Sequence, residues 1–367
     1  MKYLSFLLLL GAVSAYAGEN LPGNVPGPNY TSARGAAMGD AFLPLADDDA
    51  SALFYNPASL NKIRSTGFEP FDISLYGNNG YLSGLSSSNV TKITSLSGNQ
   101  PTLQANPGSF AGGGMQIFPS FFTRGFAFGV LLKSDVGAVS NSGGSITYKS
   151  LYQLIPTVGG GVRLAGGIVK LGYSLQWVNE AAGSDTVNPS ALPASCPTLG
   201  YNQCLAQGSA FSNNVGMTVT MPWQYLPAMS IVARNIGGEH FGTSSLYHFS
   251  PTPTGTLPYQ PMSVDAAFSM QPRIGSGSYV NLVGQLNDMT DTSGMGIMGR
   301  WAAGAEMSVR NVFFLRGGWG QGYPSAGFGV RQRHGEIDFT WYSEELSDTY
   351  HGQRDQRYMF QYVVRAF

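Results

Sequence analysis

The side chains that could carry out chemistry are few, and their spacing matches no catalytic or metal-binding pattern. None of the four histidines has a neighbour at a distance along the chain that would order a nucleophile, an acid or a metal ion. These histidines are His240, His248, His334 and His351. We therefore expect that the protein is not an enzyme and that it holds no metal and no cofactor.

Glycine-rich stretches occur at residues 159–161 and 317–322. A phosphate-binding loop needs a strand–loop–helix context, but both stretches fall within alternating segments that we interpret as strands. Glycine within a strand more often allows curvature or the close approach of another backbone. We therefore expect no phosphate-binding loop in either stretch.

Cys196 and Cys204 both lie in a stretch rich in Pro, Ser and Asn that we predict to be a long loop. A close, even pair of cysteines in an exported chain most simply forms a local disulfide. A metal-binding or redox pair is the alternative. The spacing is not that of a C-x-x-C motif, however, and no histidine is near, so the structural disulfide is favoured.

Two groups of charged residues remain. The acidic run Asp47, Asp48 and Asp49 could ligate a cation, although such runs are more often solvated turns or salt-bridge partners. The second group lies near the C-terminus, where charged residues alternate with apolar ones. Its members are Arg300, Glu306, Arg316, Arg331, Glu336 and Asp338.

Alternation of apolar with polar or small residues dominates residues 67–367. In one segment, for example, Val169 and Leu171 are apolar whereas Lys170 and Gly172 are not, so their side chains would face opposite sides of a sheet. The pattern recurs in about fourteen segments. The predicted strands are 67–77, 108–118, 125–135, 146–164, 167–181, 211–222, 228–241, 262–272, 278–288, 298–309, 312–321, 324–333, 335–345 and 356–367.

These strands fit a membrane better than a soluble domain. Lipid offers no partner for backbone N–H and C=O groups, so a sheet can cross a bilayer only as a closed barrel. Only 11% of the residues are charged, against about 25% in soluble domains. The gaps between strands are alternately short and long, as in barrels with short periplasmic turns and longer outer loops. The prediction is an all-β fold, a transmembrane antiparallel β-barrel of about 14 strands.

The two ends of the chain predict the location. Residues 1–17 combine Lys2, an apolar run, and Ala15 and Ala17 around Tyr16, which is the form of a signal peptide. The last predicted strand ends on Phe367, as in chains that the barrel assembly machinery inserts. We expect a protein of the outer membrane of a Gram-negative bacterium, with that machinery and outer-membrane lipids as partners. The net charge of −1 argues against nucleic acid.

Residues 18–66 are too many for a simple lead-in to the first strand. A barrel of fourteen strands would leak unless something fills it, so we predict an N-terminal plug, or hatch, in the lumen. The predicted parts are thus a signal peptide (1–17), a hatch (18–66) and a barrel (67–367). The second charged group would face the lumen. There it could anchor the hatch or meet the carboxylate of a ligand, but we favour pairing between neighbouring strands.

Three runs in this segment, residues 32–42, 46–52 and 55–60, resemble the hatch of the outer-membrane transporters of the long-chain fatty-acid (FadL) and toluene-transport family. They are also similar to barrels attached to the type IX secretion system. The resemblance covers residues 30–60 and departs from the family at Asp40, where a second glycine is common. It implies passive uptake of hydrophobic compounds such as long-chain fatty acids, with Asn56, Pro57 and Ala58 as the hatch turn.

An alternative function remains open on the sequence alone. A barrel of this kind could fail to transport and instead bind a protein partner, such as a secretion-system component or a surface scaffold. The predicted outer loop 242–261 contains Tyr247, Phe249 and Tyr259, which could form an apolar surface. Such a surface could bind a hydrophobic small molecule or lipid, and it could equally bind a protein.

Overall fold

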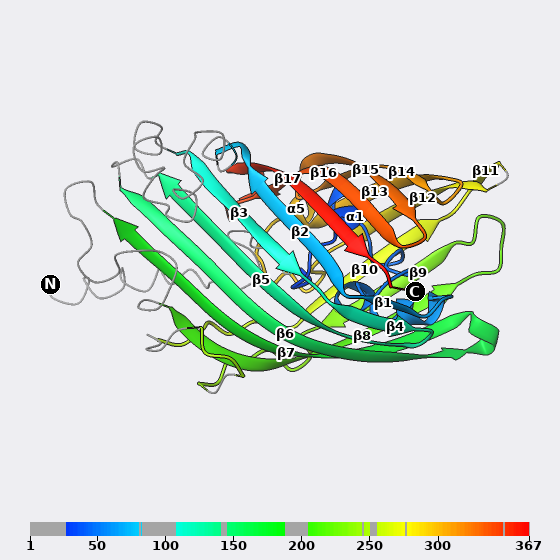
Figure 1. Ribbon diagram of the computed structural model, residues 1–367, viewed down its shortest axis with the longest axis horizontal. Coiled ribbons are helices and arrows are strands. Elements are labelled where there is room, and N and C mark those ends of the chain that lie inside the picture. The colour runs from blue at the N-terminus through cyan, green and yellow to red at the C-terminus, as the bar shows by residue number, and fades with distance from the viewer. Residues whose placement is uncertain are drawn as a thin grey trace, which may run out of the picture.

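The computed structural model describes residues 27–80, 82, 108–140, 145–187, 205–243, 246–249, 255–275, 277–347 and 349–366. Within these residues, seventeen strand segments form one antiparallel sheet (Figure 1). They are β1 (Gly67–Glu69), β2 (Phe71–Asn78), β3 (Phe110–Ile117), β4 (Ser120–Thr123), β5 (Phe126–Ser140), β6 (Ile146–Leu164), β7 (Val169–Val187), β8 (Ala206–Thr220), β9 (Ala228–Arg234), β10 (Ser263–Met270), β11 (Arg273–Gly275), β12 (Ser278–Leu286), β13 (Trp301–Val309), β14 (Phe313–Gly320), β15 (Tyr323–Gln332), β16 (Gly335–Glu345) and β17 (Arg354–Val364).

The sheet closes on itself because β17 pairs with β2, with Val364 opposite Phe71. Three crossing strands are interrupted, namely β1 with β2, β3 with β4, and β10 with β11, so the seventeen segments make fourteen crossings. The predicted fourteen-stranded antiparallel β-barrel is confirmed. Among the described residues, no helix is long and apolar enough to cross a membrane.

The two faces of the wall differ as the alternation predicts. Tyr173 and Leu315 on the outer face are 45% and 60% exposed, whereas Ser174 and Glu306 on the inner face are fully buried. An outer face of this kind suits lipid, and the polar inner face needs partners within the barrel.

Several strand boundaries differ from the prediction. The segment predicted at 228–241 ends as a strand at Arg234, because Asn235 and the following glycines adopt positive φ. The segment predicted at 298–309 begins as a strand only at Trp301, because the residues before it form the short helix α5 (Ile297–Arg300). Strands β5, β7 and β8 are longer than predicted, since their pairing continues beyond the apolar alternation.

Two crossing strands are irregular near one end of the barrel, although the Phe118 N–H still donates to the Asp72 carbonyl at 2.9 Å. Pro70 separates β1 from β2, and Phe118 and Pro119 separate β3 from β4. Proline has no N–H to give to a ladder, and the β1–β4 pairing is shifted from the β2–β3 pairing. We call this place the wall break (residues 70, 118 and 119).

The two ends of the barrel are unlike. Short connections join the strands at one end, which we call the turn end; the other is the loop end (right and left in Figure 1). The turn end includes the 3-10 helix η4 (Ala165–Gly167) between β6 and β7. Strands β6 and β7 have 19 residues each whereas β14 has 8, so the wall is much taller on one side.

Residues 27–66, which we call the N-terminal segment, lie inside the ring of strands (blue in Figure 1). The segment contains α1 (Ala33–Ala37), α2 (Ala52–Tyr55) and the 3-10 helix η1 (Pro57–Lys62). Helix α1 contacts β14 to β17, whereas η1 contacts β5 to β8 on the opposite wall. The large side chains of the N-terminal segment are almost fully buried, among them Tyr30, Phe42 and Phe54.

Candidate functional site

The N-terminal segment and the inner wall around it form the candidate site. Helices of four to six residues are not stable alone, so their geometry is set by contacts with the wall. These contacts are of three kinds: a turn around Asn56, glycines in the strands, and a ring of buried ion pairs.

The turn at Asn56 joins α2 to η1. Asn56 is fully buried, and its Oδ1 accepts a hydrogen bond from the Ala58 N–H at 3.1 Å, which caps η1. Pro57 is at the first position of η1, where a missing N–H costs nothing. The Asn56 Nδ2 donates to the Leu43 carbonyl and to Thr218 Oγ1 of β8, both at 3.0 Å. Asn56 therefore ties two parts of the segment to the wall.

Glycines in the wall make room for this turn. A Cβ at Gly172 would come within 2.1 Å of the Pro57 carbonyl carbon, and one at Gly216 within 2.3 Å of Asn56 Oδ1. A Cβ at Gly161 would meet the Asn61 side chain at 2.3 Å. A side chain at Gly172 would displace the backbone of the turn, and one at Gly216 or Gly161 would push aside the side chain of Asn56 or Asn61. Close approach of another backbone therefore explains Gly172, whereas Gly216 and Gly161 make room for side chains of the segment.

Glycines in the opposite wall likewise allow the end of α1 to pack closely against the strands. A Cβ at Gly318 would lie 2.1 Å from the Met38 carbonyl carbon, and one at Gly320 would lie 2.2 Å from the Gly39 oxygen. At this point the chain turns with φ of 65° at Gly39 and 62° at Asp40. A left-handed backbone favours glycine, which explains why a second glycine would suit the position that Asp40 occupies.

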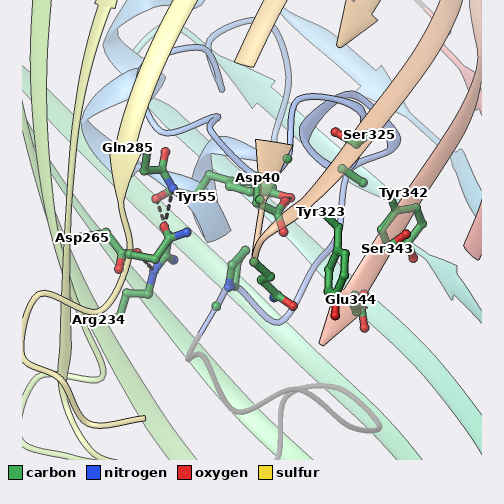
Figure 2. Close-up of a pocket in the computed structure, with 17 residues that line it drawn as sticks. Asp40, Tyr55, Arg234, Asp265, Gln285, Tyr323, Ser325, Tyr342, Ser343 and Glu344 are labelled. Carbon is green, nitrogen blue, oxygen red and sulfur yellow. Dashed lines mark hydrogen bonds and ion pairs between the residues drawn. The ribbon is translucent and has the colours of Figure 1, made fainter. Parts of the chain in front are cut away.

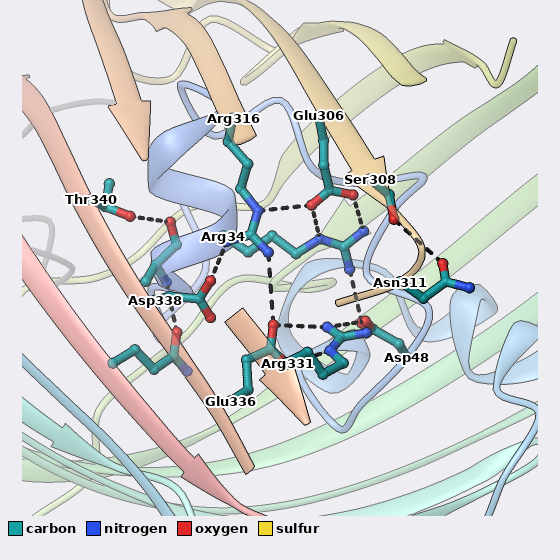
Figure 3. Close-up of polar contacts among 12 residues, drawn as sticks. Arg34, Asp48, Glu306, Ser308, Asn311, Arg316, Arg331, Glu336, Asp338 and Thr340 are labelled. Carbon is teal, nitrogen blue, oxygen red and sulfur yellow. Dashed lines mark hydrogen bonds and ion pairs between the residues drawn. The ribbon is translucent and has the colours of Figure 1, made fainter. Parts of the chain in front are cut away.

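A closed ring of alternating charges fixes the segment to β13, β14, β15 and β16 (Figure 3). Arg34 of α1 donates from Nε and Nη2 to the two Glu306 oxygens, each at 2.7 Å. Arg34 Nη1 also pairs with Asp48 at 2.9 Å. Asp48 in turn pairs with Arg331 at 2.6 Å. The segment thus contributes two members, Arg34 and Asp48, to the ring.

Wall residues complete the ring. Glu306 accepts from Arg316 Nε at 2.8 Å, and Arg316 lies 3.7 Å from Glu336. Glu336 pairs with Arg331 at 2.6 Å, and Arg316 also pairs with Asp338. The side chains of Glu306 and Arg316 are fully buried. Buried charges are tolerated only when they are paired and hydrogen-bonded, so these partners depend on one another.

The three aspartates of the acidic run have separate roles. Burial alone would raise the pKa of Asp48, but Arg331 and Arg34 hold it well below its usual range. Burial raises the pKa of Asp47 to about 6, although Lys62 opposes the shift. Asp49 accepts a hydrogen bond from the Ser51 N–H at 2.8 Å. Within the described residues, no group of His, Cys, Asp and Glu could hold a metal ion.

The six charged residues singled out in the strands do not all come together. Four of them, Glu306, Arg316, Arg331 and Glu336, belong to the ring, and Asp338 bonds to Arg316 beside it. Arg300 does not, because it lies in α5 rather than on a strand. It donates to the Asp288 carbonyl at 2.6 Å and lies 3.3 Å from Asp291. Cys196 and Cys204 lie outside the described residues, as does Phe367, so the disulfide and the terminal signal stay predictions.

Several contacts between the segment and the wall were missed in the sequence. Arg34 is a lone charge within a run of small residues, and that isolation was a usable signal. Arg234 pairs with Asp265 at 2.7 Å and donates to the Phe54 and Tyr55 carbonyls at the end of α2. Gln361 Oε1 accepts from the Ala33 N–H at 2.9 Å. Neither Arg234 nor Gln361 belongs to a motif that would have revealed its partner.

A small polar cavity lies on the loop-end side of the segment (Figure 2). It has a volume of about 50 Å³ and is lined by Asp40, Tyr55, Arg234, Tyr323 and Glu344, among others. Burial raises the pKa of Asp40 to about 6. A space of this size holds a few water molecules at most, so it is no passage for an organic solute.

A larger apolar space lies on the outside of the wall over β3, β5 and β6, beside residues 247 and 249, and we call it the outer groove. Its volume is about 440 Å³. Outward-facing Met115 and Leu132 form part of its floor, and Phe249 stacks on Tyr152 with ring centroids 6.2 Å apart. The Leu246 N–H donates to Asn179 Oδ1 at 2.6 Å, which fixes this loop to β7. Its apolar lining residues are Met115, Ile117, Leu132, Tyr152, Leu154, Leu205, Tyr247 and Phe249.

Comparison with known proteins finds no matching family model and no matching curated sequence. Solved structures do match. The toluene transporter TodX of Pseudomonas putida is 12% identical, with 91% of this chain and 97% of that chain covered and a TM-score of 0.51. The toluene transporter TbuX of Ralstonia pickettii is also 12% identical, with 94% and 99% covered and a TM-score of 0.50. The chain therefore has the fold of the outer-membrane hydrocarbon transporters of the toluene-transport type, as the resemblance in its N-terminal segment implied.

Proposed function

We propose that this protein is a passive outer-membrane transporter for hydrophobic compounds and that the N-terminal segment is its hatch. One observation carries the proposal: residues 27–66 lie inside the ring of strands and are bonded to opposite walls at the same time. A barrel built only as a scaffold has no need of such a filling. The shared fold with TodX and TbuX, which are named as toluene transporters, supports the proposal.

Capture would begin at the outer groove. Its apolar lining and its volume of about 440 Å³ suit an organic molecule rather than water. Because its floor includes outward-facing residues of β3 and β5, a solute could reach it from the lipid as well as from outside. Tyr247, which is 55% exposed, would meet the solute first.

Passage would require movement of the hatch. The cavity beside it is too small for a hydrocarbon. The turn at residues 56–58 and the ring through Asp48 are the contacts that would have to yield. Short helices held only by their contacts with the wall are suited to such a movement.

The charges favour uncharged solutes over fatty-acid anions. Three carboxylates of the ring (Asp48, Glu306, Glu336) alternate with three arginines (Arg34, Arg316, Arg331), and Asp338 adds a fourth carboxylate beside the ring. This ring has no surplus positive charge for a carboxylate head group. We therefore assign the ring to anchoring the hatch, and we place neutral hydrocarbons ahead of long-chain fatty acids as the substrate.

Exit would be sideways into the membrane at the wall break. Inside the break, Phe118 packs against Tyr30 and Phe54 with ring centroids 5.2 Å away from each. An apolar solute released there would find aromatic surface on one side and lipid on the other, once the remaining bond from the Phe118 N–H to the Asp72 carbonyl, 2.9 Å long, had opened. In this proposal the protein is inserted by the barrel assembly machinery and surrounded by outer-membrane lipids.

The test is uptake of labelled toluene and of a labelled long-chain fatty acid by cells that lack their own transporters. We compare the full chain with a variant that lacks residues 56–58, after checking that each barrel is inserted. Saturable uptake that changes in the deletion variant supports a hatch-gated transporter. Absence of uptake of both solutes by an inserted barrel contradicts the proposal and favours a barrel that binds a protein through exposed Leu246, Tyr247 and Tyr259.

A further inference from the structure

Exposed arginines surround the turn end of the barrel. They come from the lead-in to β1, from four connections between strands or the residues beside them, and from β11, so they are distributed around the circumference. All of them are exposed to solvent. We call them the arginine rim: Arg64, Arg124, Arg163, Arg273, Arg310 and Arg333.

The rim is not neutralised by the protein. No rim residue forms an ion pair with another described residue, whereas Arg316, Arg331 and Arg365 are all paired. The acidic residues of the strands at this end are buried: Glu69 is 2% exposed and bonded to Arg365, and Glu336 is 8% exposed and bonded to Arg331. The rim therefore presents uncompensated positive charge to its surroundings.

Exposed apolar side chains lie among these arginines. Leu164 and Ile168 flank the turn after Arg163, and Ile274, next to Arg273, is 63% exposed. Trp223 is 66% exposed in the turn between β8 and β9. Aromatic and apolar side chains mixed with cations mark the boundary between lipid and water. At that depth an arginine can extend its stem along the lipid and place its guanidinium among head groups.

We propose that the arginine rim binds the anionic head groups of phospholipids in the leaflet that surrounds the turn end. A guanidinium can hold two phosphate oxygens at once, and the rim offers this geometry at several places around the barrel. The inference goes beyond the transport proposal, because it depends only on the barrel being in a membrane. Its consequence is a fixed depth and an annulus of preferred lipid.

The experiment measures the lipid retained by the purified full-length barrel. Protein in detergent is mixed with equal amounts of phosphatidylglycerol and phosphatidylcholine, free lipid is removed, and the retained lipids are quantified by mass spectrometry. The test variant carries Arg163→Gln, Arg273→Gln and Arg310→Gln. The matched control carries lysine at the same three positions, which keeps the charge. Both are compared with the natural sequence at low and high salt.

The proposal predicts that the natural barrel retains phosphatidylglycerol in preference to phosphatidylcholine, and that salt reduces the preference. The glutamine variant should lose most of it, by about five-fold for each arginine that meets a phosphate, while the lysine variant keeps most of it. Equal retention of the two lipids by the natural barrel overturns the proposal, as does an unchanged preference in the glutamine variant. A rim that is merely solvated, or that binds an acidic protein instead, gives one of these results.

Discussion

Replacing Glu306 with glutamine should release the hatch. Glu306 lies in the wall and is fully buried, and it accepts two hydrogen bonds from Arg34, the one guanidinium that α1 contributes to the ring. Arg316 also bonds to Glu306, but both belong to the wall, so that contact survives when the segment leaves. Only the Arg34 bonds therefore enter the equilibrium between docked and released hatch.

The size of the effect follows from these two bonds. Breaking a buried ion pair by removing one partner costs about 3–5 kcal/mol, and Arg34 keeps only Asp48 as its charged partner. Because glutamine retains the shape and one acceptor, we expect the lower value, about 3 kcal/mol. This corresponds to an increase of about a hundredfold in the ratio of released to docked hatch.

The assay is the frequency of channel opening in planar bilayers. It is supported by maleimide labelling of a cysteine placed at Ala36, which is 2% exposed, in a chain whose two natural cysteines are serine. Glu345→Gln is the matched control, because Glu345 is also fully buried but bonds to Tyr323 and to the loop after β16. We expect opening and labelling to rise in Glu306→Gln and not in Glu345→Gln.

Equal behaviour of the two variants would refute this reasoning. Arg34→Met and the double variant separate loss of docking from loss of folding. If Arg34 and Glu306 act through their mutual contact, the double variant should be far less affected than the sum of the two single changes.

Two further predictions concern the contacts of the hatch, and a third concerns the outer groove. In the docked hatch, burial raises the pKa of Asp40 and Asp47 from 3.8 to about 6. Docking is therefore favoured at low pH and weakens as the pH rises through 6. Maleimide labelling at position 36 should increase between pH 5 and pH 7.5, and Asp40→Asn should flatten the increase. Gly216→Ala places a Cβ 2.3 Å from Asn56 Oδ1 and should raise the frequency of channel opening several-fold. Gly275→Ala, whose Cβ meets no atom within 4 Å, should not change this frequency. Equal conductance records for the two variants would contradict a role of Gly216 in holding the turn. Phe249→Ser opens the outer groove and should raise the substrate concentration for half-maximal uptake without reducing the amount of inserted barrel, as measured by uptake at several toluene concentrations.

The barrel could be predicted because lipid and lumen impose opposite chemistry on the two faces of every strand. That contrast is visible in single residues, such as Tyr173 beside Ser174. The lengths of β5, β7 and β8 could not be predicted in the same way, because beyond the membrane both faces of a strand meet water or loops and the alternation fades. Arg300 was wrongly predicted to lie on a strand because it directly precedes Trp301 and so continues the alternation of that strand. The alternation does not show that Arg300 is instead the last residue of helix α5.

The contacts between the hatch and the wall were only partly predictable. The turn at Asn56 and Pro57 is a local pattern, since the capping bond joins residues two apart. The bond between Arg34 and Glu306 spans 272 positions of the chain, and no local pattern sets which strand faces the hatch. The same holds for Gly172 and Gly318, whose missing side chains have meaning only once Pro57 and Met38 are known to lie against them.

A reversible lock between hatch and wall tests the central claim most directly. A Cβ at Gly327 would lie 2.7 Å from the Ala37 Cβ, so with a shift of about one ångström a disulfide can join Ala37→Cys to Gly327→Cys. The two natural cysteines are replaced by serine, and each single variant serves as a control for the change at its position. Toluene uptake is then measured in the oxidised and the reduced state of the same cells. A gating hatch predicts that oxidation stops uptake and that reduction restores it; uptake that continues at an unchanged rate with the disulfide formed would contradict it.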